Sequence, residues 1–481
     1  MKLTPNQKRT LTAVLILTLI LVYSPHLANP FPNHIDEWRH ITETIKLKQG
    51  EYSGNWNSVE LGFHIFLLPL SILTNIVLFY KFLPAIWAIF SALTLFYIIK
   101  NKTSHLKKSF LIAIFSIIFF ASIKSNANIT GLWFFTPLTF SIPFIFLYIY
   151  LFSEGMQKQN KKYILSSFII MILLIPTHAI SVLFAIPALF IFSLFHLNYI
   201  KKQYKFFSIF LLIPLIGIFF HSQLFNLTLI ESIKQITTQL QFKLGFGVLE
   251  LNNSFFELYS PIGYLLAILG TIYIITSKRK FKHYLIYFLL PITLLINILI
   301  FKQTGISYLS PYQRNLYYLA ISLPFLSALG LYYLLILLKK ISKKEFHKII
   351  TIITIIIVII FTFASYYSIP NNIKLYKTIN NDNYQALKFI SLLEPKPSTI
   401  MAPASISTAI FPITQHKPVG TIFFYGNRAD VESFFRSEDC DTKNQLIEKH
   451  NVKYILSENN IKCNWTEIYN KNNNFVYKIN N

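Results

Sequence analysis

Long apolar runs separated by short basic clusters dominate the first 369 residues of the chain. A membrane-spanning helix needs about 20 mainly apolar residues, and it satisfies its own backbone hydrogen bonds. The pattern therefore predicts an α-helical polytopic membrane protein with about 11 transmembrane helices. The predicted spans lie near residues 9–24, 82–99, 109–124, 132–153, 163–178, 179–198, 206–222, 259–276, 283–301, 313–338 and 349–368.

The basic clusters between these runs set the predicted topology, because lysine and arginine favour the cytoplasmic side. They alternate with longer or less charged loops only if residues 61–80 do not cross the membrane as an ordinary span. That segment carries His64 and Pro69 and ends at Lys81, which makes it a poorer span than its neighbours. We therefore expect residues 24–81 to form one large external loop with re-entrant or interfacial helices. The N-terminus is then cytoplasmic and the C-terminus extracytoplasmic.

The first apolar run resembles a secretory signal peptide. Residues 11–23 follow Lys2, Lys8 and Arg9, which is the charge pattern that precedes the apolar part of such a peptide. Residues 24–30, however, are crowded with prolines and form a poor cleavage site. We expect this run to be retained as the first span.

The composition changes after residue 369, which we take as the end of the helical module, residues 1–369. Residues 370–481 hold ten of the twenty acidic residues, and their hydrophobic periodicity is mixed. The predicted strands are 399–404, 419–424, 452–457 and 475–479, and the predicted helices are 384–393, 428–435 and 442–450. This alternation predicts a small extracytoplasmic α/β domain.

Composition excludes several classes of protein. Only 13% of the residues are charged, about half the usual share of a soluble domain. The net charge of +24 is spread in short clusters between apolar runs, so we expect membrane lipid rather than nucleic acid as a partner. The phosphate-cradling motifs GxxxxGK[ST] and GxGxxG are absent, which argues against an ATP-driven pump.

The two cysteines, Cys440 and Cys463, both fall in the predicted external domain. An oxidising compartment permits a disulfide, so we expect them to be joined. The alternative is two unpaired thiols on neighbouring elements. The motifs CxxC and HExxH are absent, so the sequence carries no recognisable zinc or redox motif.

An acidic pair, Asp36 and Glu37, follows the first apolar run, and Asp36 is the only aspartate before Asp382. Apolar residues within 36–48 predict a helix that lies in the membrane interface, with Asp36 in its first turn. A carboxylate at this place can deprotonate an acceptor hydroxyl or amine as a general base. The alternative is a solvated loop whose acids only cap the helix that follows.

This arrangement resembles the GT-C superfamily of membrane glycosyltransferases, whose signature is a paired acidic motif in the first external loop. The pair Asp36-Glu37 matches that motif in position and type. The many spans, the helix-bearing loop and the external C-terminal domain match the layout of the superfamily. The resemblance implies a polyprenyl-phosphate-linked sugar donor, a glycan, lipid or protein acceptor, and catalytic roles for Asp36 and Glu37.

Two departures limit what the resemblance implies. Many relatives carry another acidic residue in the second external loop, but residues 124–128 contain none. A divalent metal shared between two acidic loops is therefore unsupported, and we assign neither a cofactor nor metal ligands. The WWDxG motif of oligosaccharyltransferases is also absent, so transfer to an asparagine sequon is not implied.

The superfamily needs a cation near the outer face to hold the phosphate leaving group. Arg314, at the start of the tenth predicted span, is the first candidate, because a guanidinium binds phosphate through paired hydrogen bonds. Lys302 is a weaker candidate, and Lys243 is weaker still. The alternative for Arg314 is an interfacial side chain that extends toward the headgroups.

Further candidates surround these positions. His178, predicted at an external helix end, and His40, beside the acidic pair, are candidate substrate-binding residues, and a structural role is the alternative for His178. Three tyrosines, Tyr312, Tyr317 and Tyr318, are interpreted as an aromatic belt in preference to a sugar platform.

Together these observations predict a multi-pass plasma-membrane glycosyltransferase of the inverting GT-C type, which moves a hexosyl or pentosyl group to an acceptor on the external face. Two alternatives stay open. One is a cell-envelope polysaccharide ligase or polymerase, although those enzymes usually carry their long functional loop late in the chain. The other is a transporter or flippase for lipid-linked sugars, although the predicted spans are nearly free of charge.

Overall fold

The computed structural model describes the chain except for residues 1–2, 28, 53–59, 126–130, 244–257, 278–280, 342–345, 368–377, 395–396, 423–425 and 480–481. The chain divides into two compact units. The first comprises Met1–Leu21, Trp87–Leu132 and Pro137–Ile369, and the second comprises Val22–Ile86, Trp133–Thr136 and Pro370–Asn481. The second unit thus groups the first loop with the C-terminal residues. The domain limits 1–369 and 370–481, drawn from the sequence, remain a prediction.

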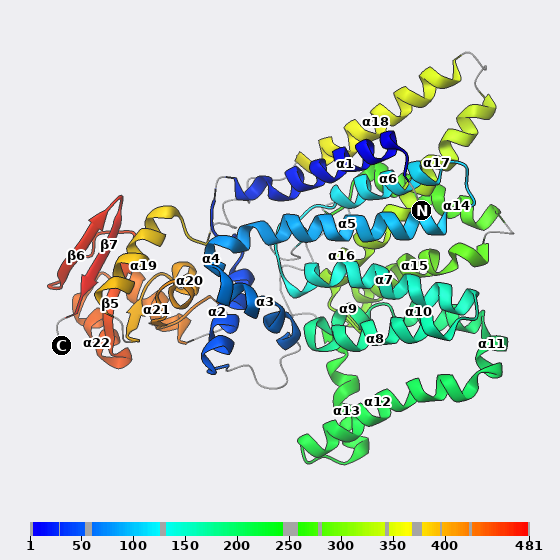
Figure 1. The fold of residues 1–481 in the computed structure, drawn as a ribbon. Helices are drawn as coiled ribbons and strands as arrows, with labels where there is room; N and C mark the ends of the chain where they lie inside the picture. Colours follow the sequence, from blue (N-terminus) through cyan, green and yellow to red (C-terminus); the bar gives the residue numbers. More distant parts are fainter. Residues whose placement is uncertain are drawn as a thin grey trace. The chain divides into compact units, whose positions relative to one another are not determined.

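The first unit is almost entirely helical (Figure 1). Its helices, two of which begin or end in residues of the second unit, are α1 (Pro5–Tyr23), α5 (Leu83–Lys102), α6 (Ser109–Ala121), α7 (Pro137–Gln157), α8 (Lys161–His178), α9 (Ile180–Leu183), α10 (Ile186–Leu194), α11 (Leu197–Lys202), α12 (Tyr204–Leu224), α13 (Leu229–Gln239), α14 (Pro261–Thr276), α15 (Phe281–Thr304), α16 (Tyr312–Ser322), α17 (Pro324–Ile341) and α18 (His347–Tyr367). Two short strands, β1 (Gln241–Lys243) and β2 (Ile306–Tyr308), pair antiparallel.

Seven helical segments among the described residues are long and apolar enough to cross a membrane. Shorter apolar helices occupy the other predicted spans, namely Ser109–Ala121, Ile180–Leu194, Pro261–Thr276 and Lys348–Ala364. Each predicted span thus corresponds to a helix or to two consecutive helices. The polytopic α-helical fold with a C-terminal α/β domain is confirmed.

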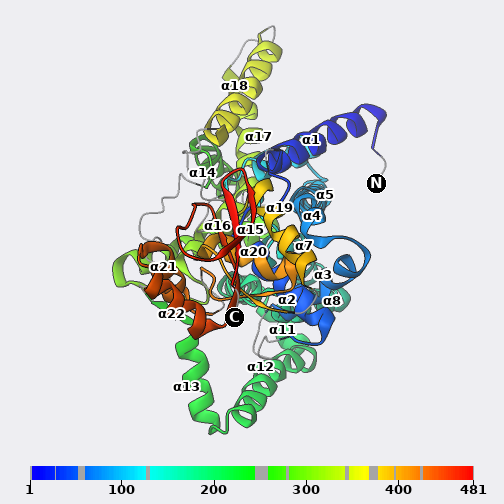
Figure 2. The same cartoon turned by 90° about the vertical axis from the view of Figure 1, so that its left-hand side faces the viewer.

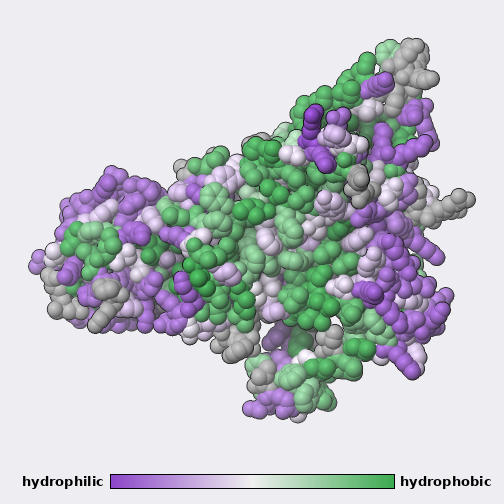
Figure 3. Space-filling model, viewed as in Figure 1, coloured by the Kyte–Doolittle hydropathy of each residue, from purple (hydrophilic) through white to green (hydrophobic). Residues whose placement is uncertain are grey.

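The surface of the first unit fits a lipid environment. Large apolar side chains are exposed along its helices, for example Leu173 on α8, Ile216 on α12 and Ile268 on α14. Figure 3 shows broad apolar areas over the visible helices of this unit, while hydrophilic residues gather around α11. Apolar patches of this extent are rare on soluble proteins, and lipid tails cover them without cost.

The segment 61–80 forms a short helix followed by a break. Helix α3 (Leu61–Leu73) has 13 residues and contains Pro69. At 1.5 Å per residue it is about 20 Å long, which is less than the ~30 Å hydrocarbon core. After Thr74 a new helical run begins with α4 (Ile76–Phe79) and continues to Lys102, so the second predicted span starts earlier than its pattern indicated. Helix α6, which occupies a predicted span, also has 13 residues, so length alone does not place α3. The expectation that residues 61–80 stay outside remains a prediction.

The C-terminal part of the second unit is a mixed α/β structure, which is drawn in orange and red at the front of Figure 2. Its sheet has the order β4-β3-β5-β7-β6, in which β3 runs parallel to β4 and β5, and β7 runs antiparallel to β5 and β6. The elements are α19 (Asn381–Leu393), β3 (Thr399–Met401), α20 (Ala404–Thr414), β4 (Lys417–Pro418), α21 (Arg428–Arg436), α22 (Cys440–His450), β5 (Val452–Ser457), β6 (Thr466–Lys471) and β7 (Asn474–Lys478).

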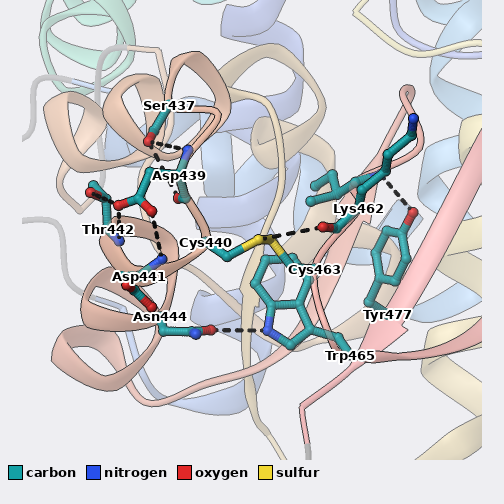
Figure 4. Close-up of a disulfide and its surroundings, with 11 residues drawn as sticks. Ser437, Asp439, Cys440, Asp441, Thr442, Asn444, Lys462, Cys463, Trp465 and Tyr477 are labelled. Carbon is teal, nitrogen blue, oxygen red and sulfur yellow. Dashed lines mark hydrogen bonds between the residues drawn. A yellow bond between two sulfur atoms is a disulfide. The ribbon is translucent and has the colours of Figure 1, made fainter.

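The predicted pairing of Cys440 and Cys463 is confirmed as a disulfide. Figure 4 shows that it joins the start of α22 to the loop before β6. Beside it, Trp465 Nε1 donates a hydrogen bond to Asn444 Oδ1 at 3.0 Å. The bridge therefore fastens a surface helix to the edge of the sheet.

The first loop also packs on this α/β structure within the second unit. Helix α2 (Ile35–Gln49) lies against α20, where Lys46 Nζ is 5.7 Å from the ring centroid of Phe411. Nearer the start of the loop, the rings of Phe31 and Tyr384 lie 4.7 Å apart. These contacts hold the acidic pair on a folded support.

Candidate active site

Helix α2 begins directly at the acidic pair. His34 is its N-cap: the ring Nδ1 accepts a hydrogen bond from the N–H of Asp36 at 3.2 Å, and the carboxylate of Glu37 accepts one from the N–H of His34 at 3.0 Å. This reciprocal capping satisfies N–H groups that the first turn of a helix leaves without intrahelical partners. Gly50 ends the helix in the left-handed conformation, with φ of 74°. The predicted helix, with Asp36 in its first turn, is confirmed.

The carboxylate of Asp36 is partly open to solvent, with a side-chain exposure of 24%. Its Oδ2 lies 3.7 Å from Nδ1 of His34. The positive end of the helix dipole favours a negative charge at this position. A partly exposed, oriented carboxylate can meet an acceptor hydroxyl or amine and remove its proton.

Glu37, the other member of the pair, is completely buried. One carboxylate oxygen accepts hydrogen bonds from the N–H groups of Asn33 and His34, and the other accepts one from the N–H of Phe135 at 2.8 Å. Burial raises the pKa of Glu37 to about 7, although the three N–H groups act in the opposite direction. Because both oxygens are engaged with the backbone, Glu37 fixes the start of α2 rather than facing solvent.

Asn33 extends this buried network to the end of the first span. Its Nδ2 donates to His26 Nδ1 at 3.1 Å, its Oδ1 accepts from Asn29 at 2.8 Å, and its backbone oxygen accepts from Thr378 at 3.3 Å. The other ring nitrogen of His26 lies 2.9 Å from the backbone oxygen of Trp133. Three sequence segments, 26–33, 133–135 and Thr378, therefore meet beside the acidic pair.

A second polar cluster lies further along α2. Arg39 donates to Glu60 at 2.5 Å, and its Nη2 is 3.4 Å from His40 Nε2. His40 Nδ1 is 3.0 Å from His64 Nε2 on α3, and the hydroxyl of Tyr52 is 3.0 Å from His64 Nδ1. Burial lowers the pKa of His64 to about 4, so this ring is neutral at pH 7.

Sequence reasoning selected His40 but missed its partners. His64 counted only as a polar residue that weakens a predicted span, and Glu60 carried no signal. The order of the residues does not reveal that α3 folds back on α2, which brings these side chains together.

The candidate phosphate-binding cations belong to the first unit. Arg314 is half-buried in the first turn of α16, close enough to interact electrostatically with Tyr317 and Tyr318. Lys302 is exposed in the last turn of α15. Lys243, on β1, pairs with Ile306 on β2, and β2 connects α15 to α16, so all three cations lie at the same end of this unit.

A buried polar network orders the turn that precedes Arg314. The amide of Asn315 donates to the hydroxyl of Ser307 at 2.8 Å, and that hydroxyl donates to the backbone oxygen of Ser310 at 2.7 Å. All three residues have no exposed side-chain surface. The start of α16 is therefore rigidly placed.

His178 ends α8 and is buried. Its Nδ1 lies 2.6 Å from the hydroxyl of Ser181, which is 3.1 Å from the hydroxyl of Tyr318. Ser181 also accepts a hydrogen bond from Tyr148 at its backbone oxygen. These contacts favour the structural role for His178, in which it joins α8 to α16.

The three tyrosines do not form the aromatic belt predicted for them. Tyr312, Tyr317 and Tyr318 are each at most 1% exposed. Tyr318 stacks on Phe184 at 3.8 Å between centroids, and Tyr312 stacks on Phe301 at 4.5 Å. Since a belt residue must reach the lipid headgroups, these rings are packing residues of the helical unit.

No protein-family model matches this chain, and no curated protein matches it. Solved structures of the oligosaccharyltransferase from Archaeoglobus fulgidus resemble it. The apo form has a TM-score of 0.58 at 13% identity, covering 93% of this chain and 69% of that chain. The form tethered to an acceptor peptide with an NVT sequon has a TM-score of 0.53 at 13% identity, with the same coverages of 93% and 69%.

A further structure of that archaeal enzyme, in complex with an inhibitory peptide and a dolichol-phosphate, has a TM-score of 0.56 at 13% identity. It covers 95% of this chain and 70% of that chain. Likeness at this identity establishes the fold. The chain therefore shares the fold of that archaeal oligosaccharyltransferase over most of its length.

Proposed function

We propose that this chain is an integral-membrane glycosyltransferase that moves a sugar from a polyprenyl-phosphate donor to an acceptor on the external face of the membrane. The observation that carries the proposal is the partly exposed carboxylate of Asp36, held in the first turn of α2 by a capped and buried support. The fold shared with oligosaccharyltransferases supports a lipid-linked donor.

In the proposed reaction Asp36 takes a proton from the acceptor hydroxyl or amine. The acceptor atom then forms a bond to the anomeric carbon of the sugar while the bond from that carbon to the phosphate oxygen breaks. Attack from the face opposite the leaving group inverts the anomeric configuration. The transferred group is a hexose or a pentose.

Further residues have proposed roles beside that of Asp36. Glu37 is a positioning residue, because its carboxylate spends both oxygens on backbone N–H groups that orient the turn carrying Asp36. Arg314 binds the donor phosphate and neutralises the charge that develops on the departing oxygen. Lys302 assists from the end of α15. His40 supports the start of α2 from within its own network, whereas His178 is a structural residue of the first unit.

The proposal also includes an orientation. The chain lies in the plasma membrane with a cytoplasmic N-terminus, and α2, α3 and the C-terminal α/β domain lie outside. The disulfide between Cys440 and Cys463 supports this orientation, because disulfides persist in oxidising compartments.

Substitution of the proposed base tests the mechanism. Asp36→Asn keeps the shape of the side chain but cannot accept a proton, so sugar transfer from radiolabelled polyprenyl-phosphate donors should fall about 10²- to 10⁴-fold. The measurement uses purified chain in lipid nanodiscs with a panel of donors and acceptors.

Asp382→Asn is the matched control, since Asp382 is a partly exposed aspartate in the first turn of α19 and lies in the same unit. It should retain full activity. Turnover by the Asp36 variant equal to that of the unsubstituted chain would remove the mechanism. Activity only with a polyprenyl-diphosphate glycan would instead favour a polysaccharide ligase or polymerase.

A further inference from the structure

Three potential metal ligands meet where α3 folds back on α2. His40 lies on α2, His64 on α3, and Glu60 immediately precedes α3. One nitrogen of each ring and one carboxylate oxygen all lie within 4.8 Å of one another. Both histidines are 1% exposed, whereas the side chain of Glu60 is 21% exposed. An ion could therefore reach the two buried rings from the side of Glu60.

The spacing of the two rings is close to that of a metal site. His40 Nδ1 and His64 Nε2 face each other at 3.0 Å. Two nitrogens bound to a tetrahedral Zn²⁺ with bonds of about 2.05 Å lie roughly 3.3 Å apart. Opening the rings by a few tenths of an ångström and drawing Glu60 inward would complete three ligand positions.

We infer that His40, Glu60 and His64 bind one divalent transition-metal ion of the Zn²⁺ type, which fastens α3 to α2. Two imidazoles and one carboxylate suit Zn²⁺, whereas Mg²⁺ and Ca²⁺ prefer oxygen ligands throughout. The hydroxyl of Tyr52 already lies 3.0 Å from His64 Nδ1, the ring nitrogen that does not face the metal position. Such a contact orients the ring of a ligating histidine.

The carboxylates around the three ligands can balance the charge of a divalent cation. Arg39 interacts electrostatically with three carboxylates, those of Glu60, Asp36 and Glu43. Lys46 lies 3.6 Å from Glu43 and offsets part of that negative charge. Arg39 donates to one oxygen of Glu60 and thereby leaves the other oxygen as a ligand.

Metal binding requires that neither of the two facing ring nitrogens carries a proton. A proton on Nδ1 of His40 would therefore move to Nε2 of the same ring, so that Nδ1 can bind the ion. The contact between Nε2 and Arg39 is long, at 3.4 Å, and it opens in that step. No net proton has to leave, because both rings bind as neutral imidazoles.

The site is separate in its ligands from the acidic pair. Asp36 and His40 are four residues apart on α2, so their Cβ atoms lie roughly 6 Å apart on the same face of the helix. None of the three inferred ligands is Asp36 or Glu37. Loss of the metal and loss of the proposed general base can therefore be separated by mutation.

Metal binding is tested on the full-length chain in detergent, first stripped with a chelator. Titration with Co²⁺, a spectroscopic substitute for Zn²⁺, should give visible absorption of a low-symmetry site at about one ion per chain. Elemental analysis after incubation with Zn²⁺ and dialysis should give the same ratio, and Zn²⁺ should raise the melting temperature. His40→Gln and His64→Gln should each abolish all three signals.

Two variants serve as controls. His196→Gln removes a histidine of the first unit, and Asp36→Asn removes the proposed base; both should bind the ion as the unsubstituted chain does. Absence of bound ion in the unsubstituted chain would overturn the inference. So would binding that survives in both histidine variants, or binding that is lost in Asp36→Asn but kept in His64→Gln. Size-exclusion profiles verify that each variant is folded.

Discussion

Two adjacent carboxylates acquire opposite characters in this structure. Asp36 is partly exposed, whereas Glu37 is buried and accepts three backbone hydrogen bonds. Consecutive residues on a helix point about 100° apart, so one can face solvent while the next faces the interior. Within the acidic pair, Asp36 is therefore placed to react, and Glu37 holds Asp36 in position.

The buried carboxylate makes stability depend on pH. Burial raises the pKa of Glu37 from 4.5 to about 7, so the protonated form favours the folded state. At about 1.4 kcal/mol per unit, this contribution is about 3 kcal/mol. It is fully present below pH 4.5 and is lost as the pH rises through 7.

Glu37→Gln removes this titration, although its single acceptor oxygen leaves at least one of the three N–H groups without its partner. The melting temperature of the unsubstituted chain should fall between pH 5 and pH 8 more steeply than that of Glu37→Gln. Scanning fluorimetry in detergent at both pH values measures the difference. Equal slopes in the two proteins would show that Glu37 does not titrate in this range.

The sequence predicted only part of this site. Asp36 could be placed in the first turn of a helix because its type, its rarity and the following apolar spacing are local features. The burial of Glu37 depends on Phe135, which is 98 residues away in the chain. The pairing of His40 with His64 depends likewise on how two helices pack. Contacts of this kind leave no mark in a single sequence.

Helices α14 and α17 show how closely two elements of the first unit approach. A Cβ atom added to Gly270 would lie 2.0 Å from the backbone oxygen of Leu326, and one added to Gly330 would lie 1.8 Å from that of Leu266. Small residues of this kind let membrane helices meet backbone to backbone. The contact therefore depends on the absence of two side chains.

Alanine at Gly330 should separate these helices and destabilise the chain by about 1–3 kcal/mol or more. Gly217 on α12 is the matched control, because nothing lies within 4 Å of a Cβ atom added there. Gly217→Ala should be neutral or slightly stabilising, as alanine favours a helix more than glycine does. Melting temperatures of both variants test the pair, and equal effects would contradict the packing argument.

Prediction of the C-terminal elements succeeded where the pattern was strong. The predicted strands 452–457 and 475–479 correspond to β5 and β7, and the predicted helices correspond to α19, α21 and α22. The first predicted strand was too long, since β3 ends at Met401 and α20 begins at Ala404. The predicted strand 419–424 is wrong over residues 419–422, which follow the two-residue strand β4 (Lys417–Pro418), and its last two residues lie outside those described.

Two C-terminal elements were missed altogether. Strand β6 lies at the edge of the sheet, is mostly polar and has no buried residue, so it lacks the alternation that marks a strand. Helix α20 contains Pro412 in its last turn, and several of its residues suit a strand as well as a helix. Both form because the sheet and α2 give them a surface to pack on.

At the scale of the whole chain, the proposed topology has a direct test. Cys440 and Cys463 are joined and are the only cysteines, so a single added cysteine provides the free thiol. Glu438→Cys in the C-terminal domain should react with a membrane-impermeant maleimide in intact cells. Lys162→Cys at the start of α8 should react only after the membrane is opened.

Both positions are exposed, so accessibility within the fold does not limit the reaction. Labelling of the α8 position in intact cells would reverse the orientation. Glu51→Cys, an exposed position just after α2, reports on the loop that carries the acidic pair and should behave as the C-terminal position does.

The hydrogen bond from Thr378 to Asn33 spans 345 residues and has a consequence for biosynthesis. At 5 to 20 residues per second, Thr378 is synthesised roughly 17 to 70 seconds after Asn33. During that interval the first loop lacks Thr378, the residue that later donates a hydrogen bond to Asn33. The acidic residues near the start of the message thus acquire their final surroundings only when translation is nearly finished, so truncated products should carry an unassembled loop.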